Sequence, residues 1–464
     1  MIRARVTTVL ASVLLACSVG MQPAEAASKK LKVLILAGQS NMVGHSRGHT
    51  MATLFNSDGP KDRTLIDLVF GKDTQLSKKR FDETRALARQ LNELTGGIGD
   101  PKIKAMTDAA QKASAEAEAE RMKASLAAYK KDVEAASAVS DRVYISSISD
   151  KNSKSGKLSI GHAGHGPTSI GPEYAFGLSI AQKIDGPILL IKTSWGGKSL
   201  NYDFRPPSRP DYKTTPEYAE AKAKTEEALK RYEAAVKSFP QAQEKYKSDL
   251  AAYEEQMKTA DEKTRKKLRK PREPREPRKP RPFAMDAAGV NYRMMNETVH
   301  KVLDNLKENH PAYDPAVGYE IAGFVWFQGF NDQFNDHFKA NYKDNMVAFI
   351  KDVRKEYKTP KMPFVIGVLG TPKTKEKVAE NAVSVAQREA AAVPEFKGNV
   401  VAVESYTEQA LDSWEVYDAG WPKNYYEWNL VGSDRPYHYL GAGKFFVRLG
   451  VAFATAMAGM IPKQ

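Results

Sequence analysis

Six short apolar runs, separated by amphipathic stretches, constrain the fold of this chain more than any other feature. They cover residues 31–37, 142–146, 187–193, 321–327, 363–369 and 399–404, and β-branched side chains are frequent in them. Their apolarity is continuous rather than alternating, which is typical of parallel strands covered by helices on both faces. The stretches between them have helical periodicity. The sequence therefore predicts an α/β fold, a three-layer α/β/α sandwich around a mostly parallel sheet.

Two segments rich in Ala, Glu and Lys interrupt this alternation. They cover residues 76–140 and 213–283, and each is predicted to contain an α-helical hairpin inserted into the α/β domain. The helices of the second segment are expected to separate at Phe239 and Pro240. Apolar side chains recur in them at helical spacing, which gives each helix a narrow stripe suited to pairing.

The net charge of +14, from 70 Lys and Arg against 56 Asp and Glu, is concentrated in one tract. Residues 263–281 hold eleven basic side chains and two acidic ones. Proline recurs there at every third position from Pro271, which favours an extended polyproline II rod that displays Arg. No aromatic side chain is interleaved to stack on bases, which argues against a nucleic-acid partner. We interpret the tract as an exposed linker, with contact to an anionic polymer or the cell envelope as the alternative.

The N-terminus has the pattern of an export signal. Two arginines precede an apolar run over residues 6–19, and the sequence Ala-Glu-Ala that ends at Ala26 supplies the small residues that a signal peptidase reads. We expect residues 1–26 to be a signal peptide and residues 27–462 the exported domain, located in the periplasm, the cell envelope or the medium. Lipidation of Cys17, the single cysteine, is the alternative.

Polar loops follow three of the predicted strands. Ser40 comes directly after the first strand, Gly196 and Gly197 follow the third, and Asn331 follows the fourth. Because the carboxyl ends of parallel strands meet at one edge of a sheet, we expect these loops to lie close together. A serine at a strand-to-helix junction is in the position of a nucleophile. Glycine N–H groups and an asparagine amide are donors that stabilise an oxyanion.

The segments GQSNM, GPEYAFG, WGGKSL and WFQGFND, followed by a late histidine, resemble the SGNH-hydrolase superfamily. Within it they resemble the sialate O-acetylesterase domain of carbohydrate acetylesterases. The resemblance implies a flavodoxin-like fold and a serine esterase without cofactor or metal. It also implies that Ser40 is the nucleophile and His438 the base. The oxyanion hole would combine the N–H groups of Ser40 and Gly197, or of its neighbour Gly196, with the Asn331 amide.

One departure from the family pattern concerns the acid that orients the base. The family has Asp three residues before the histidine, whereas Asp434 precedes His438 by four, with Pro436 between them. Asp434 is the predicted acid. Glu404 and Glu427 are the alternatives.

Other residues near the predicted nucleophile are candidates for substrate contact or for the base. Substrate contacts are predicted for Gln39, Gln328, Trp195 and His165. His45 is a rival base, but its closeness to Ser40 in sequence suggests that it begins the following helix instead of facing the hydroxyl.

The sequence thus predicts an exported esterase that removes sialate- or polysaccharide-linked acetyl groups from carbohydrate through an acyl-enzyme on Ser40. One alternative is a non-catalytic envelope protein that binds polysaccharide with the same fold. The presence of Ser40, Asn331 and His438 together argues against it, because a binding module needs no such set. A lipase or arylesterase is a further alternative, weakened by the lack of a long apolar lid segment. The oligomeric state is left open.

Overall fold

The structure, a computed structural model, describes residues 29–56, 60–149, 153–164, 166–265, 268–280 and 288–462. The predicted signal peptide, Cys17 and His165 lie outside these residues. At the centre is a seven-stranded sheet with the strand order β4-β3-β6-β1-β7-β8-β9.

Six parallel strands and one antiparallel edge strand form this sheet. The parallel strands are β1 (Leu31–Gly38), β3 (Val143–Ser149), β6 (Ile188–Ser194), β7 (Tyr319–Phe327), β8 (Phe364–Val368) and β9 (Val400–Glu404). Each coincides with one of the six apolar runs. The antiparallel strand β4 (Ser153–Lys157) was not predicted, because it is polar and mostly exposed and has no apolar signal.

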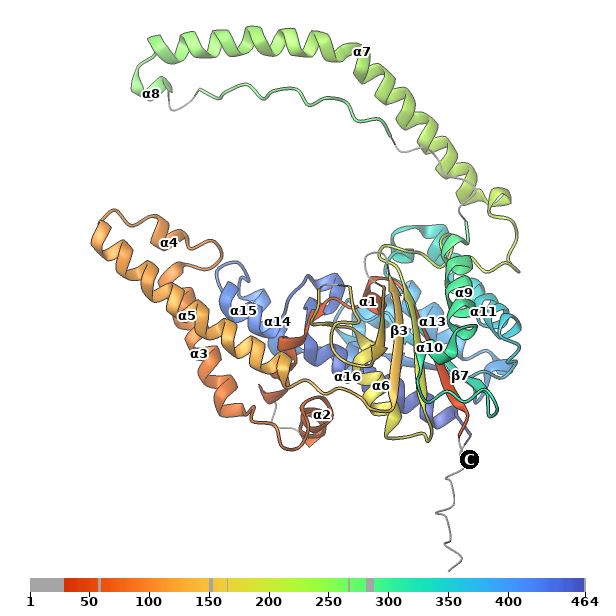
Figure 1. The fold of residues 1–464 in the computed structure, drawn as a ribbon. Helices are drawn as coiled ribbons and strands as arrows, with labels where there is room; N and C mark the ends of the chain where they lie inside the picture. The colour runs from red at the N-terminus through yellow and green to blue at the C-terminus, as the bar shows by residue number, and fades with distance from the viewer. Residues whose placement is uncertain are drawn as a thin grey trace, which may run out of the picture.

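Helices cover both faces of the sheet, as Figure 1 shows. One face carries α6 (Pro172–Ala181) and α16 (Gly443–Met460), and the other carries α9 (Val290–Leu303), α11 (Asp336–Glu356) and α13 (Ala382–Ala391). Successive side chains of β1 enter the two cores in turn: Leu34 and Leu36 pack with α6 and α16, whereas Val33 and Ile35 pack with α9 and α11. The predicted three-layer sandwich is confirmed.

Short elements connect these layers. They are α1 (Ser40–Val43), β2 (Ser46–Arg47), η1 (Gly48–Asn56), α2 (Pro60–Phe70), β5 (Ser169–Ile170), η2 (Tyr212–Thr214), α10 (Leu306–Asn309), η3 (Asp332–Phe334), α12 (Lys375–Glu380), η4 (Pro394–Phe396), η5 (Ser405–Glu408), α14 (Leu411–Asp418), α15 (Tyr425–Val431) and η6 (Pro436–Gly441), where η marks a 3₁₀ segment. Among the described residues, no helix has the length and apolar character needed to cross a membrane.

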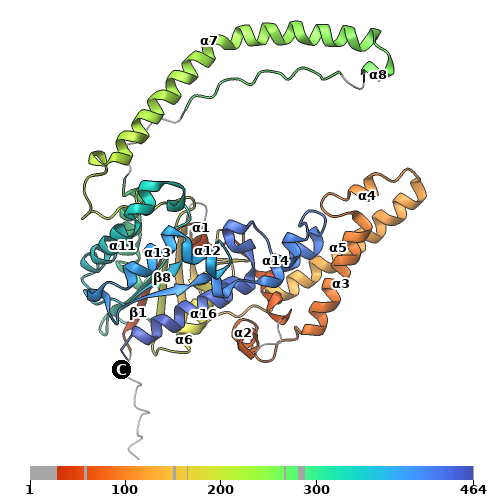
Figure 2. The ribbon, with the colours of Figure 1, turned by 180° about the vertical axis from the view of Figure 1, so that it is seen from behind.

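The first inserted segment contains two long helices, α3 (Lys78–Thr95) and α5 (Ala109–Ala135), with α4 (Pro101–Lys104) between them. They lie side by side and project from the body (Figures 1 and 2). Arg85 and Arg89 of α3 attach this arm to α15 through ion pairs with Glu427, at 2.6 and 2.8 Å.

The second inserted segment differs from the expected pair of helices. A single helix of 44 residues, α7 (Pro216–Thr259), runs through Phe239 and Pro240. Proline removes one main-chain hydrogen bond and crowds the preceding turn, but the Ala, Glu and Lys residues on both sides favour helix strongly enough for it to continue. The expected break was therefore wrong.

The proline tract returns alongside α7. After α8 (Glu262–Arg265), residues 268–280 are extended and lead back toward the body (Figures 1 and 2). The prolines at 271, 274, 277 and 280 are half-buried, whereas the charged residues between them are exposed. Aromatic residues along α7 are also half-buried, at Tyr232, Phe239, Tyr246 and Tyr253. This pattern indicates that the proline side of the rod faces α7 and the charged groups face outward.

Candidate active site

Three loops meet at the carboxyl edge of the sheet. The strands β1, β6 and β7 end at one level, because Gly38 pairs with both Ser194 and Phe327. Gly38 has a φ of 156°, and a Cβ atom there would lie 2.2 Å from the carbonyl oxygen of Phe327. Glycine is therefore required at the turn that leads from β1 into Ser40, the first residue of α1.

Ser40 lines a cavity of about 330 Å³. Gly197, Asn331 and His438 line the same cavity, so four residues selected from the sequence come together from four separate segments. Among the described residues, no hydrogen bond joins the Ser40 hydroxyl to His438. Hydrogen bonds between catalytic groups often tighten only when substrate is bound.

The segment before η6 brings Asp434 to the predicted base. His438 Nδ1 donates to Asp434 Oδ2 at 2.9 Å. Main-chain N–H groups of Ser433 and Asp434 donate to the carbonyl oxygen of Leu440, at 2.8 and 2.9 Å, and close a loop over residues 433–440. This loop contains Pro436 and folds back so that Asp434 contacts His438. The longer spacing therefore does not separate the acid from the histidine.

The two alternative acids are engaged elsewhere. Glu404 forms a two-pronged ion pair with Arg388, at 2.6 and 3.0 Å. Glu427 holds the α3 arm through Arg85 and Arg89. Asp434, which is hydrogen-bonded to His438, is therefore the carboxylate that contacts the predicted base.

His45 faces the cavity, contrary to the sequence-based expectation. Its Nδ1 donates to the same Asp434 Oδ2 at 2.7 Å, and its ring lies against that of His438, with centroids 3.6 Å apart and planes inclined by 33°. The expectation was wrong because α1 is only one turn long and ends at Val43. Gly44, with a φ of 87°, then redirects the chain toward the cavity.

Asp434 is held ionised by its neighbours. Burial alone would raise the pKa of Asp434, but hydrogen bonds from His438 and His45 outweigh burial and hold the pKa well below its ordinary value. The main-chain N–H of Arg435 donates to the second oxygen, Oδ1, at 2.7 Å. The two imidazoles and the carboxylate are compact enough to surround a metal ion. Both Nδ1 atoms are hydrogen-bonded to Oδ2, an arrangement that also suits an acid–base group.

Gly197 and Asn331, the predicted oxyanion-stabilising residues, lie next to each other in the wall of the cavity. Gly197 has a φ of 68°, and a Cβ atom there would lie 3.8 Å from the side-chain nitrogen of Asn331. A side chain at this glycine would therefore occupy the space beside the amide donor. Gly196 lines the cavity as well, so both glycines remain candidates for the main-chain donor.

Residues 290–412 match the family described as carbohydrate esterase, sialic acid-specific acetylesterase. The matched segment covers about a quarter of the chain and contains Asn331, whereas Ser40 and His438 lie outside it. The resemblance inferred from the motifs is thereby confirmed, and the matched family consists of hydrolases that act on esters of carbohydrate.

Two solved structures resemble the chain at low sequence identity. One is a protein from Arabidopsis thaliana, 12% identical, with 92% of this chain and 98% of that chain covered and a TM-score of 0.37. The other is a carbohydrate acetylesterase from Xanthomonas citri, 10% identical, with 80% of this chain and 49% of that chain covered and a TM-score of 0.32. No curated protein matches the sequence.

Three residues predicted to contact the substrate lie behind the Ser40 cavity instead. Gln39 and Gln328 are only 1% and 3% exposed, and Gln328 Nε2 donates to Gln39 Oε1 at 3.3 Å. The same oxygen accepts the main-chain N–H of Asn331 at 3.4 Å. Trp195 is buried against Phe204 in the core. These side chains hold the loops in place, so the prediction of substrate contact was wrong for them.

Asp332 is a residue of the candidate active site that the sequence analysis missed. It is fully buried and accepts the main-chain N–H groups of Leu200 and Asn201, at 3.0 and 3.1 Å, and Gln328 Nε2 at 2.6 Å. Burial raises the pKa of Asp332 to about 7, although these hydrogen bonds oppose the shift. The carboxylate ties the loop after β6 to the loop after β7. An acidic residue directly after Asn331, in a loop that follows a buried strand, was the available signal.

A buried ion pair lies beneath the Ser40 cavity. The side chains of Lys192 and Glu173 are 0% and 1% exposed and are 2.7 Å apart. Lys192 Nζ also donates to the carbonyl oxygens of Val43, at 2.9 Å, and His162, at 3.2 Å. The pair thereby joins the end of α1 to the loop that carries Gly164. Val43, at the end of α1, and Gly164 both line the cavity. A lysine inside an otherwise apolar strand was the available signal.

We expect Lys192→Met to lower the free energy of unfolding by ~3–5 kcal/mol, because Glu173 would be left buried without a counter-ion. The double variant Lys192→Met/Glu173→Leu removes both charges and should recover most of that loss. Denaturant unfolding of the two variants and the parent measures the difference. Parent-like stability of the single variant would show that the ion pair does not hold this region.

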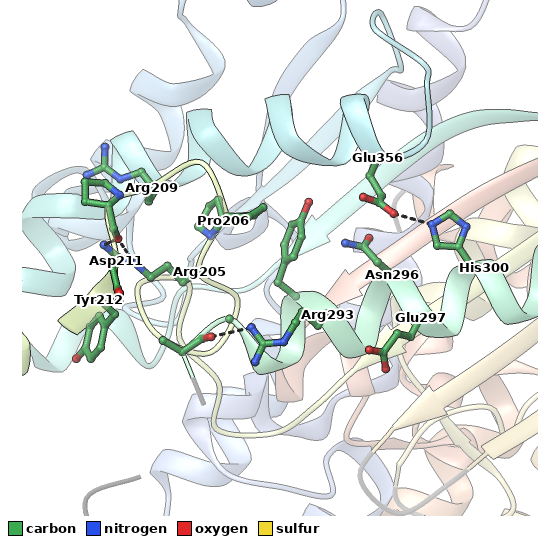
Figure 3. Close-up of a pocket in the computed structure, with 15 residues that line it drawn as sticks. Arg205, Pro206, Arg209, Asp211, Tyr212, Arg293, Asn296, Glu297, His300 and Glu356 are labelled. Atoms are coloured by element: carbon green, nitrogen blue, oxygen red, sulfur yellow. Dashed lines mark hydrogen bonds and ion pairs between the residues drawn. The ribbon is translucent and has the colours of Figure 1, made fainter. Parts of the chain in front are cut away.

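A larger cavity, of about 620 Å³, lies between the loop over residues 205–212 and α9 (Figure 3). Its lining residues are distinct from those of the Ser40 cavity. Several of its polar groups pair with one another: His300 lies 2.7 Å from Glu356, and Arg205 donates to the carbonyl oxygen of Pro210 at 2.9 Å. Size alone therefore does not make it the reactive site, and the smaller cavity is the candidate active site.

Proposed function

We propose that this protein is a serine esterase that removes O-acetyl groups from carbohydrate through an acyl-enzyme on Ser40. One observation carries the proposal: Ser40, Gly197, Asn331 and His438 line one cavity, and His438 is hydrogen-bonded to a half-buried, ionised Asp434. This is the set of groups that nucleophilic ester hydrolysis requires. The family of residues 290–412 supports carbohydrate as the substrate class.

In the proposed reaction, Ser40 Oγ attacks the acetyl carbonyl carbon while His438 Nε2 accepts the hydroxyl proton. The carbonyl oxygen becomes an oxyanion that faces the donors at Gly197 and Asn331. When the tetrahedral intermediate collapses, the sugar oxygen leaves with the proton from His438. Water then attacks the acetyl-serine by the same sequence of steps, which releases acetate and restores Ser40.

Aromatic side chains at the mouth of the cavity support a sugar as the leaving group. Phe330 and Tyr437 line the cavity, with ring centroids 6.0 Å apart. Phe334, 72% exposed, packs edge-on against Phe330, and Tyr437 is 44% exposed. Exposed aromatic rings present apolar faces to solvent, and such faces can stack on the C–H surface of a sugar ring.

A panel of esters tests this proposal through acetate release. It includes acetylated sialic acid, acetylated polysaccharides, a small aryl acetate and long-chain acyl esters. We expect the acetylated carbohydrates to have the highest kcat/KM. A preference for long-chain acyl esters would instead make the protein a lipase.

We also propose that the rod over residues 268–280 contacts an anionic polysaccharide. It carries six Lys and Arg side chains and two Glu side chains, all exposed. Because the prolines face α7, the basic groups are held on the outer side of a stiff segment, where they repeat along its length. We likewise propose that residues 1–26 direct export of the protein. Export would bring α7 and the rod into contact with envelope or extracellular polymers.

The triple variant Arg272→Gln/Arg275→Gln/Arg278→Gln should elute from an immobilised anionic polysaccharide at lower salt than the parent. Its kcat on a small soluble acetyl ester should be unchanged, because exposed charges are screened beyond ~10 Å at moderate ionic strength. The matched control replaces the same arginines by lysine, which keeps the charge, and it should elute near the parent. Co-elution of the glutamine variant with the parent would leave the tract as a linker.

A further inference from the structure

Two histidines that line the cavity share one oxygen of one carboxylate. His438 and His45 approach Asp434 Oδ2 at 2.9 and 2.7 Å, and their rings lie against each other. Both side chains are 12% exposed, and Asp434 is 19% exposed. The nucleophilic mechanism uses one imidazole. The second, at an equivalent position relative to the carboxylate, has no role in it.

The positions of the protons follow from the hydrogen bonds. An ionised carboxylate can only accept, so each Nδ1 that contacts Asp434 Oδ2 carries a hydrogen. In a neutral imidazole the other nitrogen, Nε2, is then the acceptor. The two rings therefore have the same tautomer, and a proton gained at Nε2 turns either ring into an imidazolium that pairs with the same carboxylate.

The short distance between the rings limits their charge. With centroids 3.6 Å apart, two imidazolium ions would repel strongly, whereas a neutral ring stacked on an imidazolium is compatible with it. Among the described residues, one carboxylate contacts both rings, and its one negative charge balances one proton. The geometry therefore disfavours a state in which both rings are imidazolium ions.

Resting on the serine-esterase function proposed above, we propose that His45 is a positioning residue of the catalytic acid–base group, which holds Asp434 and His438 and shares a single proton with His438. The reaction requires both rings to be neutral at the start. A proton on His45 blocks proton transfer from Ser40, because His438 then cannot become an imidazolium. The acid limb of the pH–rate profile is set by the pair instead of by His438 alone.

Other charged or titratable groups stand on the segments around the pair. In the described part of the chain they include Asp434, Arg47, Arg435, Tyr437, His162 and the Lys192–Glu173 pair under the cavity. The guanidinium of Arg435 lies 4.0 Å from the ring centre of Trp421, and the Lys192 ammonium is paired with Glu173. Asp434 is thus the group that contacts both imidazoles.

The variants His45→Asn and His45→Phe separate positioning from proton sharing. Asn keeps a donor for Asp434 Oδ2 but cannot ionise, so kcat at pH 8 should stay within about threefold of the parent. Phe keeps a ring against His438 but donates nothing, so kcat should fall ~10-fold. In both variants the acid limb of kcat/KM should move to lower pH, by at least ~0.3 unit, because one of two equivalent proton sites is lost.

His300→Asn is the matched control, since His300 is an exposed histidine paired with Glu356 on the surface. It should leave both the rate and the pH profile unchanged. Thermal unfolding of each variant identifies any general loss of structure, which would lower the rate without moving the acid limb. An acid limb that stays at the parent position in both His45 variants would overturn the proposal.

A measurement without substrate distinguishes this proposal from the esterase function. In Ser40→Ala, the imidazole nitrogens of His45 and His438 can be followed by NMR against pH. As the pH falls, we expect the nitrogen signals of both rings to shift over the same first titration step, each by part of its full range. At high pH, both rings should carry hydrogen on Nδ1. Complete and independent titration of each ring would overturn the shared proton, even if the protein proved to hydrolyse no ester.

Discussion

Ser40→Ala is expected to lower kcat/KM on a small acetyl ester by at least ~10⁴-fold, because the variant lacks the hydroxyl that attacks the ester in the proposed mechanism. The thermal midpoint should change little. The substitution removes one oxygen atom at the cavity wall, where it forms no described hydrogen bond with His438. Initial rates and thermal unfolding of the purified variant provide the two measurements.

Ser125→Ala is a suitable control, because Ser125 is an exposed serine of α5 on the first arm. It should keep both activity and stability. A mass increase of one acetyl group on the peptide that contains Ser40, trapped with a slowly hydrolysed ester, would support the acyl-enzyme directly. Parent-like activity in Ser40→Ala would mean that hydrolysis occurs at another nucleophile.

Asp434→Asn is expected to lower kcat by ~10³–10⁴-fold with a much smaller change in KM. The amide can donate to His438 Nδ1, which favours the tautomer with hydrogen on Nε2 and prevents that nitrogen from accepting the Ser40 proton. In the parent, kcat/KM should rise with pH, because the imidazole must lose its proton before it can act as a base. A pH–rate profile of the parent and the variant measures both effects.

Asp344→Asn, at a carboxylate that is 66% exposed on α11, serves as the control for a lost surface charge. It should leave the profile unchanged. If Asp434→Asn lost less than tenfold in kcat, the carboxylate would not be the orienting acid. The shared hydrogen-bonding arrangement with His45 would then have a structural role only.

The sheet and its reactive edge could be predicted because their signals are local. The central parallel strands β1, β6 and β8 are buried on both faces and therefore appear as continuous apolar runs. Ser40, Gly197 and Asn331 were found because each stands directly after such a run, where parallel topology brings loops together. These predictions needed only chain order and hydrophobicity.

The residues that were missed or misplaced depend on distances between segments remote in sequence. Asp434 is 389 positions from His45, and Asp332 is 132 positions from Leu200, so neither contact leaves a pattern in the sequence. The break expected at Pro240 failed for a different reason. A proline penalty of a few kcal/mol was outweighed by many neighbouring residues with high helix propensity, a sum that a single breaker residue does not reveal.

The α7 arm also affects how large the protein appears in solution. A helix of 44 residues extends ~66 Å, and it leaves the body from one end only (Figure 2). A particle with such a projection tumbles and diffuses more slowly than a sphere of equal mass. We expect the 51.4 kDa chain to elute early from a size-exclusion column, at a position where globular standards would suggest a dimer. Light scattering or sedimentation equilibrium, which do not depend on shape, will therefore be the measurements that count its subunits.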